Sequence, residues 1–464
     1  MRDYVVTLIV FASLPLILRK PFLGILVWTW LGLMNPHRLC WGFATGLPFA
    51  QMVAIATLVG LLISKEAKSM PWVTLTRLLL FWWLWMLTTT VFALLPGSAW
   101  EQWDKVWKIM LLTFVAILLL DTRERLHALV WIVVISLGFY GVKGGIFTLT
   151  SGGGEKVWGP SGTFIGGNNE IGLALIMTVP LMRYIQLASA STLVKNGMLA
   201  AMGLTVMAIL GTQSRGALVG GAAMILYLTL KSRNRARLLL LLALLLPAAI
   251  LFMPETWFSR METIETYQQD ASALGRINAW WTAFYIALDR PLVGGGFDVV
   301  SAWTFAKYAP DPAAVHDFHS IYFEVLGEQG FVGLGLFLSI GAVSMASLGR
   351  VIAFAKTRRE LLWMRDMASM VQVSLIGYAV SGAFLGLAYF DYYYTLVAIA
   401  IGLVRVKNQY ALQGVPSPSA ASGEAAMAAN GPRPQGIGPR PPRRFGAPKK
   451  PLFGFDIRGW YAKL

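Results

Sequence analysis

Residues 238–253 read LLLLLALLLPAAILFM and residues 331–345 read FVGLGLFLSIGAVSM, two runs that contain no charged residue. About 20 apolar residues in a helix cross the ~30 Å hydrocarbon core of a bilayer, so both runs are typical of membrane spans. The segment between them, residues 254–327, holds nine of the chain's 23 acidic residues but only four of its 39 basic residues. We expect most of the chemistry of the protein in this polar segment.

The whole chain repeats this alternation of apolar runs and polar connections. Its 464 residues are 56% hydrophobic and 13% charged, with a mean hydropathy of +0.60, which is too apolar for an ordinary soluble protein. In lipid every backbone amide must be satisfied within its own segment, so the runs are expected to be helices. The fold class is therefore predicted to be an all-α integral membrane protein with 12 or 13 transmembrane helices.

The count depends on the N-terminus, where residues 4–18 and 21–34 form either two spans or one broken span. Trp and Tyr at the ends of runs, such as Trp82 and Tyr392 to Tyr394, are expected to be anchors at the membrane surface. The other spans are expected at about residues 48–64, 76–95, 106–120, 127–148, 169–187, 196–212, 215–230, 237–253, 328–348, 368–387 and 391–406.

Basic residues predict the orientation of the spans. Most Lys and Arg residues lie in every second connection, which the positive-inside rule assigns to the cytoplasm. The alternate connections before residue 254 hold only Arg38, Lys105, Lys108, Lys143, Lys156 and Arg215. The chain is therefore expected in a bacterial inner membrane, among membrane lipids, with residues 254–327 in the periplasm.

The charge, the cysteine count and the tail composition exclude a nucleic-acid-binding protein and an intramolecular disulfide, and they indicate where the domains begin and end. The formal charge of +16 is explained by the connections, so no nucleic acid is expected, and the single Cys40 excludes an intramolecular disulfide or a Cys-based metal cage. From about Gln413 the chain is rich in Pro, Gly, Ala and Arg and should be disordered. We predict an N-terminal helix bundle (1–253), a periplasmic loop domain with short helices (254–327), C-terminal transmembrane helices (328–408) and a basic cytoplasmic tail (409–464).

Two arginines are candidates for binding an anion. Gln213-Ser214-Arg215-Gly216 lies at the outer end of two apolar runs, where an arginine is costly without a partner. The alternative is an interfacial arginine that reaches lipid headgroups. Gly275-Arg276 opens an amphipathic helix, and an arginine near a helix start suits phosphate oxygens. That helix ends at Pro291, and the following Gly294-Gly295-Gly296 is expected to be a turn because Walker spacing is missing.

Two histidines in the sequence His316-Asp317-Phe318-His319-Ser320 are candidates for proton transfer. A histidine with its ordinary pKa near 6.5 can take or orient a proton at working pH. A zinc pair is the less favoured alternative because no HExxH pattern or third histidine is nearby, so no metal and no cofactor are expected. A structural histidine remains open, and serine hydrolase chemistry lacks a G-x-S-x-G motif.

The predicted topology places Arg215, Arg276 and His319 on one face of one membrane. Two fixed cations and an imidazole suit a lipid-linked diphosphate donor: the arginines neutralise the leaving diphosphate and the imidazole assists the incoming hydroxyl. Weaker candidates for binding the diphosphate or the glycan are His316, Tyr322, Asn168, Asn169, Gln213 and Ser214.

The order of these motifs resembles the O-antigen ligase and polymerase superfamily. The Arg-Gly step at Arg215 is followed by Gly-Arg-x-x-x-Trp at residues 275–280, by Pro-x-x-Gly-x-Gly, and by His-Ser-x-Tyr…Glu-x-Gly-Phe-x-Gly from His319. Upstream, residues 162–170 resemble the Gly-x-Phe-x-Asn-x-Asn stretch of that family, so the likeness covers roughly residues 160–345. Leu33-Met34-Asn35-Pro36-His37-Arg38 resembles ligases found beside exosortase systems.

The resemblance implies a glycosyltransferase of the GT-C type that transfers a polysaccharide from undecaprenyl diphosphate, with inversion and without metal. In the ligase branch the acceptor is a sugar hydroxyl of the lipid A-core. Arg215 and Arg276 would bind the diphosphate, and His319 would activate or orient the acceptor. This chain has His319-Ser320 where the family commonly has His-Asn, and His316 has no clear counterpart.

Three other readings stay open from the sequence. A polymerase and a protein O-oligosaccharyltransferase share this chemistry and differ only in the acceptor. A lipid-linked glycan transporter is the alternative of another class, but a transporter buries its charges near the middle of the bilayer. Here the charged candidates lie at one outer surface, which favours the O-antigen ligase.

Overall fold

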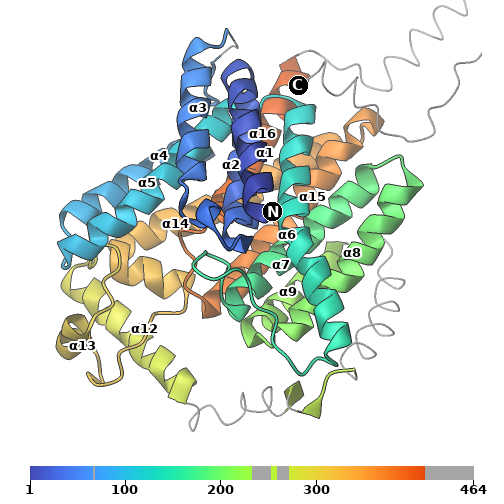
Figure 1. The fold of residues 1–464 in the computed structure, drawn as a ribbon. Coiled ribbons are helices and arrows are strands. Elements are labelled where there is room, and N and C mark those ends of the chain that lie inside the picture. The colour runs from blue at the N-terminus through green and yellow to red at the C-terminus, as the bar shows by residue number, and fades with distance from the viewer. Residues whose placement is uncertain (66–67, 232–251, 256, 259–270, 413–464) are drawn as a thin grey trace, which may run out of the picture.

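The computed structural model describes residues 1–412 except 66–67, 232–251, 256 and 259–270. The described part of the chain is all-helical and contains no β-strand, as predicted (Figure 1). Its α-helices are α1 (Arg2–Arg19), α2 (Pro21–Met34), α3 (Phe49–Ile63), α4 (Thr74–Val91), α5 (Pro96–Leu119), α6 (Arg123–Thr150), α7 (Asn168–Ala188), α8 (Thr192–Gly211), α9 (Arg215–Lys231), α12 (Ala271–Asp289), α13 (Ala302–Tyr308), α14 (Ile321–Ala355), α15 (Leu362–Ser381) and α16 (Asp391–Leu412). Short 3₁₀ turns are η1 (Pro36–Leu39), η2 (Phe43–Gly46), η4 (Arg359–Leu361) and η5 (Gly382–Phe384).

Five stretches of helix among the described residues are long and apolar enough to cross a membrane. They are α6, α7, α8, α14 and the stretch Arg359–Phe384, which includes α15. Shorter apolar helices are α2, α3 and Arg215–Leu230 of α9. The chain is thus a multi-pass membrane protein, while the predicted span 237–253 lies largely outside the described residues.

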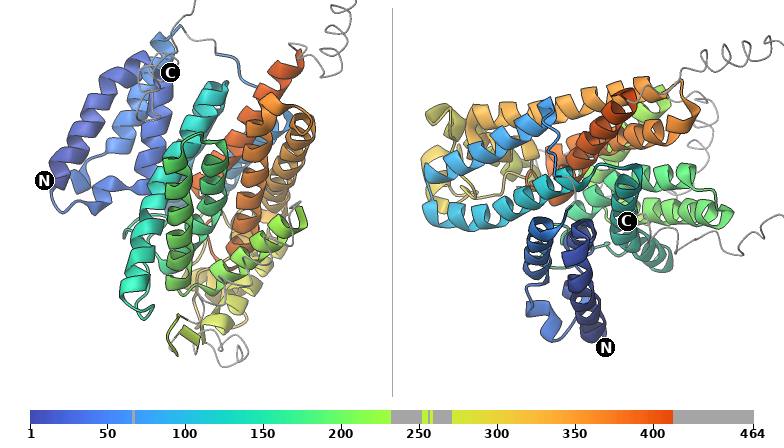
Figure 2. Two further views of the ribbon diagram at one scale, coloured as in Figure 1. Left: turned by 90° about the vertical axis from the view of Figure 1, so that its right-hand side faces the viewer. Right: turned by 90° about the horizontal axis from the view of Figure 1, so that it is seen from above.

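The N-terminal runs form two helices, because Pro21 at the first position of α2 starts a new helix after Lys20. Helices α1, α2 and α3 form a group that projects from the rest of the molecule (Figure 2). They share a small core that includes Val10, Phe49 and Val53. Contacts of α2 with α5 and α6 join this group to the main bundle.

The main core surrounds α7, α15 and α16 and contains most of the aromatic residues that the sequence placed at the membrane surface. Trp82 is fully buried, and its Nε1 donates to the Tyr394 hydroxyl at 3.0 Å. Tyr392 is buried too and donates to the Met177 carbonyl oxygen at 3.1 Å. The interpretation of Trp82 and Tyr392 to Tyr394 as surface anchors is therefore wrong, since all four side chains are buried and hydrogen bonds inside the protein satisfy the polar atoms of Trp82, Tyr392 and Tyr394.

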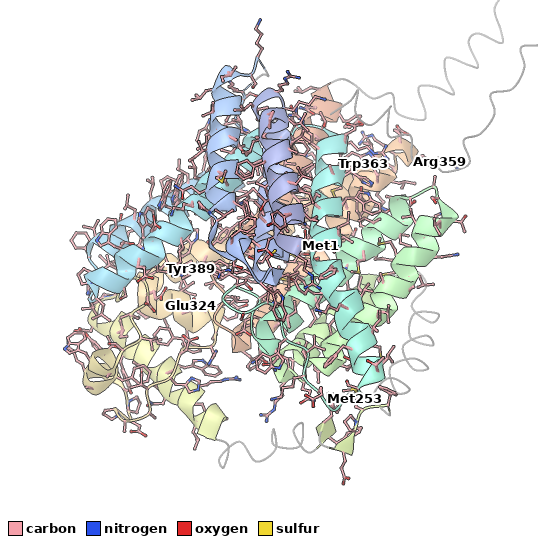
Figure 3. The ribbon with its side chains drawn as sticks, viewed as in Figure 1. Met1, Met253, Glu324, Arg359, Trp363 and Tyr389 are labelled. Atoms are coloured by element: carbon pink, nitrogen blue, oxygen red, sulfur yellow. The ribbon has the colours of Figure 1, made fainter. Side chains whose placement is uncertain are left out.

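Helix α14 changes direction at Gly330, which has φ 69° and ψ −173°. Its first segment, before this kink, belongs to the sequence that was predicted as loop. Figure 3 shows Met253 at one end of the molecule, with Arg359 and Trp363 at the other. Helices α12 and α13 lie toward the end that carries Met253 (Figure 1).

Candidate active site

Helix α12 holds the loop that carries the two histidines. The Asn278 amide donates to the carbonyl oxygens of Asp311 and Ala314 at 2.8 and 3.1 Å and accepts from the Asp311 backbone N–H at 2.9 Å. Trp280 Nε1 donates to the Phe318 carbonyl oxygen at 2.8 Å, and its ring stacks on Phe323 with 5.0 Å between centroids. Two side chains of α12 therefore fix the loop directly before His319.

Gly275 allows the loop to approach α12 closely. A Cβ atom at this position would lie 2.8 Å from Cδ2 of His316, closer than side chains normally pack. The rings of His316 and His319 meet edge to face with 5.0 Å between centroids. The Gly-Arg-x-x-x-Trp motif thus places Arg276 on the helix that packs against His316, whose ring in turn meets that of His319.

His319 is held in a strained backbone conformation next to a carboxylate. Its φ of 43° lies in the left-handed region, which is unusual for a residue with a side chain. Its Nδ1 lies 3.5 Å from Oδ2 of Asp317, and its side chain is 27% exposed. Ser320 follows as the N-cap of α14. The imidazole is therefore positioned by backbone geometry and by Asp317, and it remains accessible to a substrate.

Burial lowers the pKa of His319 below its ordinary value. The Asp317 carboxylate opposes this shift, while the positive charges of Arg276 and His316 add to it. A neutral imidazole at neutral pH can accept a proton from a hydroxyl group. The influence of Arg276 on this pKa also shows that the guanidinium lies within electrostatic range of the imidazole.

Arg276 lies in the second turn of α12, which begins at Ala271, and not at the helix start that the sequence suggested. Its charge reaches the carboxylate of Glu170 in the first turn of α7. That carboxylate folds back over Gly167, where a Cβ atom would overlap it. The charge of Arg276 thus acts on both His319 and the first turn of α7.

Arg215 begins α9 directly after a tight turn, residues 212–214. Asn168 in the first turn of α7 donates to the Thr212 carbonyl oxygen at 2.9 Å, which joins this turn to α7. The Ser214 hydroxyl accepts from the Ala217 backbone N–H at 3.2 Å and caps α9. The first turn of α7 therefore neighbours both the turn that carries Arg215 and the charge of Arg276.

Several weaker candidates have hydrogen bonds within the protein. Gln213, at φ 53°, donates to the Gly153 carbonyl oxygen at 3.3 Å, and the Tyr322 hydroxyl donates to the Ala379 carbonyl oxygen at 2.8 Å. Together with Asn168 and Ser214, these side chains shape the turns around the site. Asn169, also in the first turn of α7, is half-buried. Substrate binding by these residues and by His316 stays a prediction.

Two glutamates and a glutamine of α14 join four segments of the chain. Glu324 accepts from the Ala388 backbone N–H at 3.0 Å, and Figure 3 shows it close to Tyr389. Glu328 accepts from the Tyr389 hydroxyl at 2.6 Å and from the Asp298 backbone N–H at 2.7 Å. The Gln329 amide donates to the same hydroxyl at 3.1 Å and accepts from Thr89. This buried network supports the start of α14.

The triple glycine is a turn, as predicted, and its amides are occupied. The backbone N–H groups of Gly295 and Gly296 donate to the carbonyl oxygens of Gly327 and Glu328 at 2.7 and 2.8 Å. Gly294 and Gly296 have φ values of 61° and 82°, which favour glycine. Since those two N–H groups bind the backbone of α14, the loop serves packing and does not cradle a phosphate.

The geometry offers an imidazole oriented by a carboxylate, a guanidinium beside it and a second arginine on an adjoining turn. In the part of the chain that the structure describes, no group of three His, Cys, Asp or Glu residues could hold a metal ion. The candidate active site therefore consists of His319, Asp317 and Arg276, with Arg215 and Glu170 around the first turn of α7.

Sequence reasoning missed the supporting residues of this site. The sequence contains Asp317 and Glu170 within the motifs, but nothing in the pattern marks a role for either. Asn278 and Trp280 lie within the Gly-Arg-x-x-x-Trp pattern, which does not reveal that their amide and indole groups hold the histidine loop. The signal available in the sequence was the amide of Asn278, a polar residue inside the same motif and two residues after Arg276.

Two family models match the chain. Residues 1–190 match a family of unknown function, DUF5935, and residues 200–338 match the family described as O-Antigen ligase. A comparison with curated proteins gave no significant match. The second range includes Arg215, Arg276 and His319, whereas the stretch 162–170 lies in the first. The family consists of glycosyltransferase-like ligases and polymerases that act on lipid-linked glycans. The match over residues 200–338 supports the O-antigen ligase superfamily for this part of the chain.

Proposed function

We propose that this protein is an O-antigen ligase that acts on the periplasmic face of the bacterial inner membrane. It transfers a polysaccharide from undecaprenyl diphosphate to a sugar hydroxyl of the lipid A-core, with inversion and without a metal ion. The bundle is proposed to be of the GT-C type. The observation that carries this proposal is the Asp317–His319 pair beside Arg276, within the range that matches the ligase family.

The proposed reaction uses each of these groups once. His319 accepts the proton of the acceptor hydroxyl as the oxygen attacks the anomeric carbon of the donor sugar. The bond between that carbon and the diphosphate oxygen breaks, and the electron pair leaves with the diphosphate. Arg276 and Arg215 stabilise the growing negative charge, because fixed cations near the leaving oxygen lower the barrier. Asp317 stabilises the imidazolium that results.

Removal of the catalytic groups tests the site. Arg276→Ala and His319→Ala are each expected to reduce attachment of polymer to the lipid A-core by at least 100-fold in a complementation assay, at unchanged protein level. Lys307→Ala is the matched control, since Lys307 is an exposed cation of the same segment that pairs with Asp289. Full activity of both alanine variants would overturn the assignment.

The choice of acceptor tests the reaction. Purified protein is incubated with one undecaprenyl-diphosphate glycan and offered lipid A-core, a second donor molecule or an acceptor protein. Transfer to the lipid A-core alone is expected. Transfer to the second donor identifies a polymerase, transfer to the protein identifies an O-oligosaccharyltransferase, and movement of the intact donor across vesicles without transfer identifies a transporter.

A further inference from the structure

A groove runs along an exposed, apolar side of α6, and none of its lining residues belongs to the candidate active site. It has a volume of about 510 Å³ and is lined almost entirely by apolar side chains. Its floor is Met182 of α7. Its walls include Ile135, Phe139, Val142 and Ile146 of α6 and Met198 and Ala201 of α8.

The packing of α6 against α8 explains the groove. The two helices touch through glycines, because a Cβ atom at Gly145 would overlap the Leu204 backbone and one at Gly141 would overlap Thr205. One turn earlier, the nearest atom to a Cβ at Gly138 is Cε of Met182, at 2.9 Å. Helix α8 has moved away at that level, so the two helices enclose a wedge.

Lys143 lies at one end of this groove and is exposed. No carboxylate within ion-pair distance of it is found among the described residues, although α6 is a candidate membrane span. A charged side chain in a span is costly and needs a partner. At 1.5 Å per residue, Lys143 is about 30 Å along the helix from Arg123, the thickness of the hydrocarbon core. With Arg123 at one membrane surface, Lys143 reaches the other.

We propose that this groove binds an anionic glycerophospholipid, with the phosphate at Lys143 and one acyl chain against the apolar walls. The charge of Lys143 complements the phosphate. With Arg123 at one membrane surface, Lys143 lies at the level of the lipid headgroups of the opposite leaflet. From Lys143 to Val134 the lining of α6 is about 14 Å long, which accommodates most of one acyl chain. A polyprenyl carrier is several times longer and would leave most of its chain outside the groove.

Native mass spectrometry tests the proposal with full-length protein released from nanodiscs of equal phosphatidylglycerol and phosphatidylcholine. The wild-type protein is expected to retain phosphatidylglycerol preferentially. Lys143→Ala should reduce that preference about fivefold, and Lys143→Arg should keep it. Ala201→Trp fills the groove and should abolish retention of either lipid, whereas Ala200→Trp, at the exposed neighbouring position, should behave like the wild type.

Three results would overturn the proposal. The first is an unchanged preference in Lys143→Ala, and the second is full retention in Ala201→Trp. The third is displacement of phosphatidylglycerol from the wild-type protein by an equal amount of undecaprenyl phosphate, which would assign the groove to the carrier lipid. Thermal unfolding of each variant is measured in parallel, so that a loss of lipid is compared only between folded proteins.

Discussion

His319 combines a strained backbone, a partly exposed ring and a carboxylate at 3.5 Å. Each feature serves a different requirement of a general base. The left-handed backbone directs the ring, the exposure leaves room for a substrate, and Asp317 holds the tautomer in which the other ring nitrogen can accept a proton. At the residue scale, Asp317 is therefore the positioning residue for His319.

Asp317→Asn is expected to change the pH profile as well as the rate. Asp317 raises the pKa of His319, so its loss should lower that pKa further. Since the base must be neutral, the acidic limb of kcat/KM should move to lower pH, while the rate at pH 7.5 falls roughly tenfold because the ring is no longer oriented. Asp311→Asn, an exposed carboxylate of the same loop, is the control. A slower enzyme with an unmoved limb would contradict the positioning role.

Removal of metal ions should leave the activity unchanged within about twofold. In the proposed reaction, the guanidinium groups of Arg215 and Arg276 supply the positive charge that a divalent ion provides elsewhere. Transfer is measured before and after exhaustive treatment with EDTA, and again after addition of Mg²⁺ or Zn²⁺. Activity that disappears and returns only with one of these ions would refute a metal-independent mechanism.

The sequence pointed to the charged and proton-transferring residues of the candidate site, but not to the residues that hold them in position. Arg276 and His319 stand out because few side chains carry such charge or proton-transfer chemistry. Asp317 does not stand out, because a carboxylate in an acid-rich segment cannot be told from an ordinary solvent-exposed carboxylate. Tyr392 and Tyr394 were misread for a related reason: an aromatic residue at the end of a run is equally compatible with a surface or a core position.

At the scale of elements, the kink of α14 depends on the triple-glycine turn. Gly330 adopts φ 69°, and a Cβ atom there would overlap the Leu292 carbonyl oxygen. Gly295 and Gly296 donate to the carbonyl oxygens just before the kink. The sequence predicted the turn from its glycines, but its binding partner is far along the chain and no local pattern marks it.

Gly330→Ala should therefore destabilise the protein by about 1–3 kcal/mol, through the strained φ and the overlap with Leu292. Gly335→Ala is a matched control on the same helix, because nothing lies within 4 Å of a Cβ atom at Gly335. Thermal unfolding in detergent should show a lower Tm for Gly330→Ala alone. Equal Tm values for the two variants would show that the kink is not constrained in this way.

At the scale of the whole molecule, periodic apolar runs were sufficient to predict an all-helical multi-pass protein. The amphipathic helix expected from Gly275 to Pro291 corresponds to α12, whereas the first segment of α14 is helical where the sequence predicts a loop. Hydropathy does not reveal that segment, because a buried polar network that includes Glu324 and Glu328 replaces the apolar face. The sequence leaves open whether the N-terminal residues form one span or two, and the structure divides them into α1 and α2 at Pro21.

The orientation of the bundle can be tested across α14. This helix begins after the acid-rich segment that is expected in the periplasm and ends at a basic connection that is expected in the cytoplasm. Ala313 precedes this helix in the acid-rich segment, and Thr357 follows it among Lys356, Arg358 and Arg359; both are exposed. In a Cys40→Ser background, Ala313→Cys should react with a membrane-impermeant maleimide in cells with a permeable outer membrane. Thr357→Cys should react at least tenfold more slowly until the inner membrane is opened, because the positive connection stays in the cytoplasm.

The parent without cysteine gives the background of this labelling, and both substitutions leave the charge of each connection unchanged. Faster labelling of Thr357→Cys in closed cells would reverse the orientation. Arg276 and His319 would then face the cytoplasm, and the proposed periplasmic transfer to the lipid A-core would be wrong. Labelling as expected would place the His319 loop on the side where the lipid A-core acceptor is proposed to meet the donor.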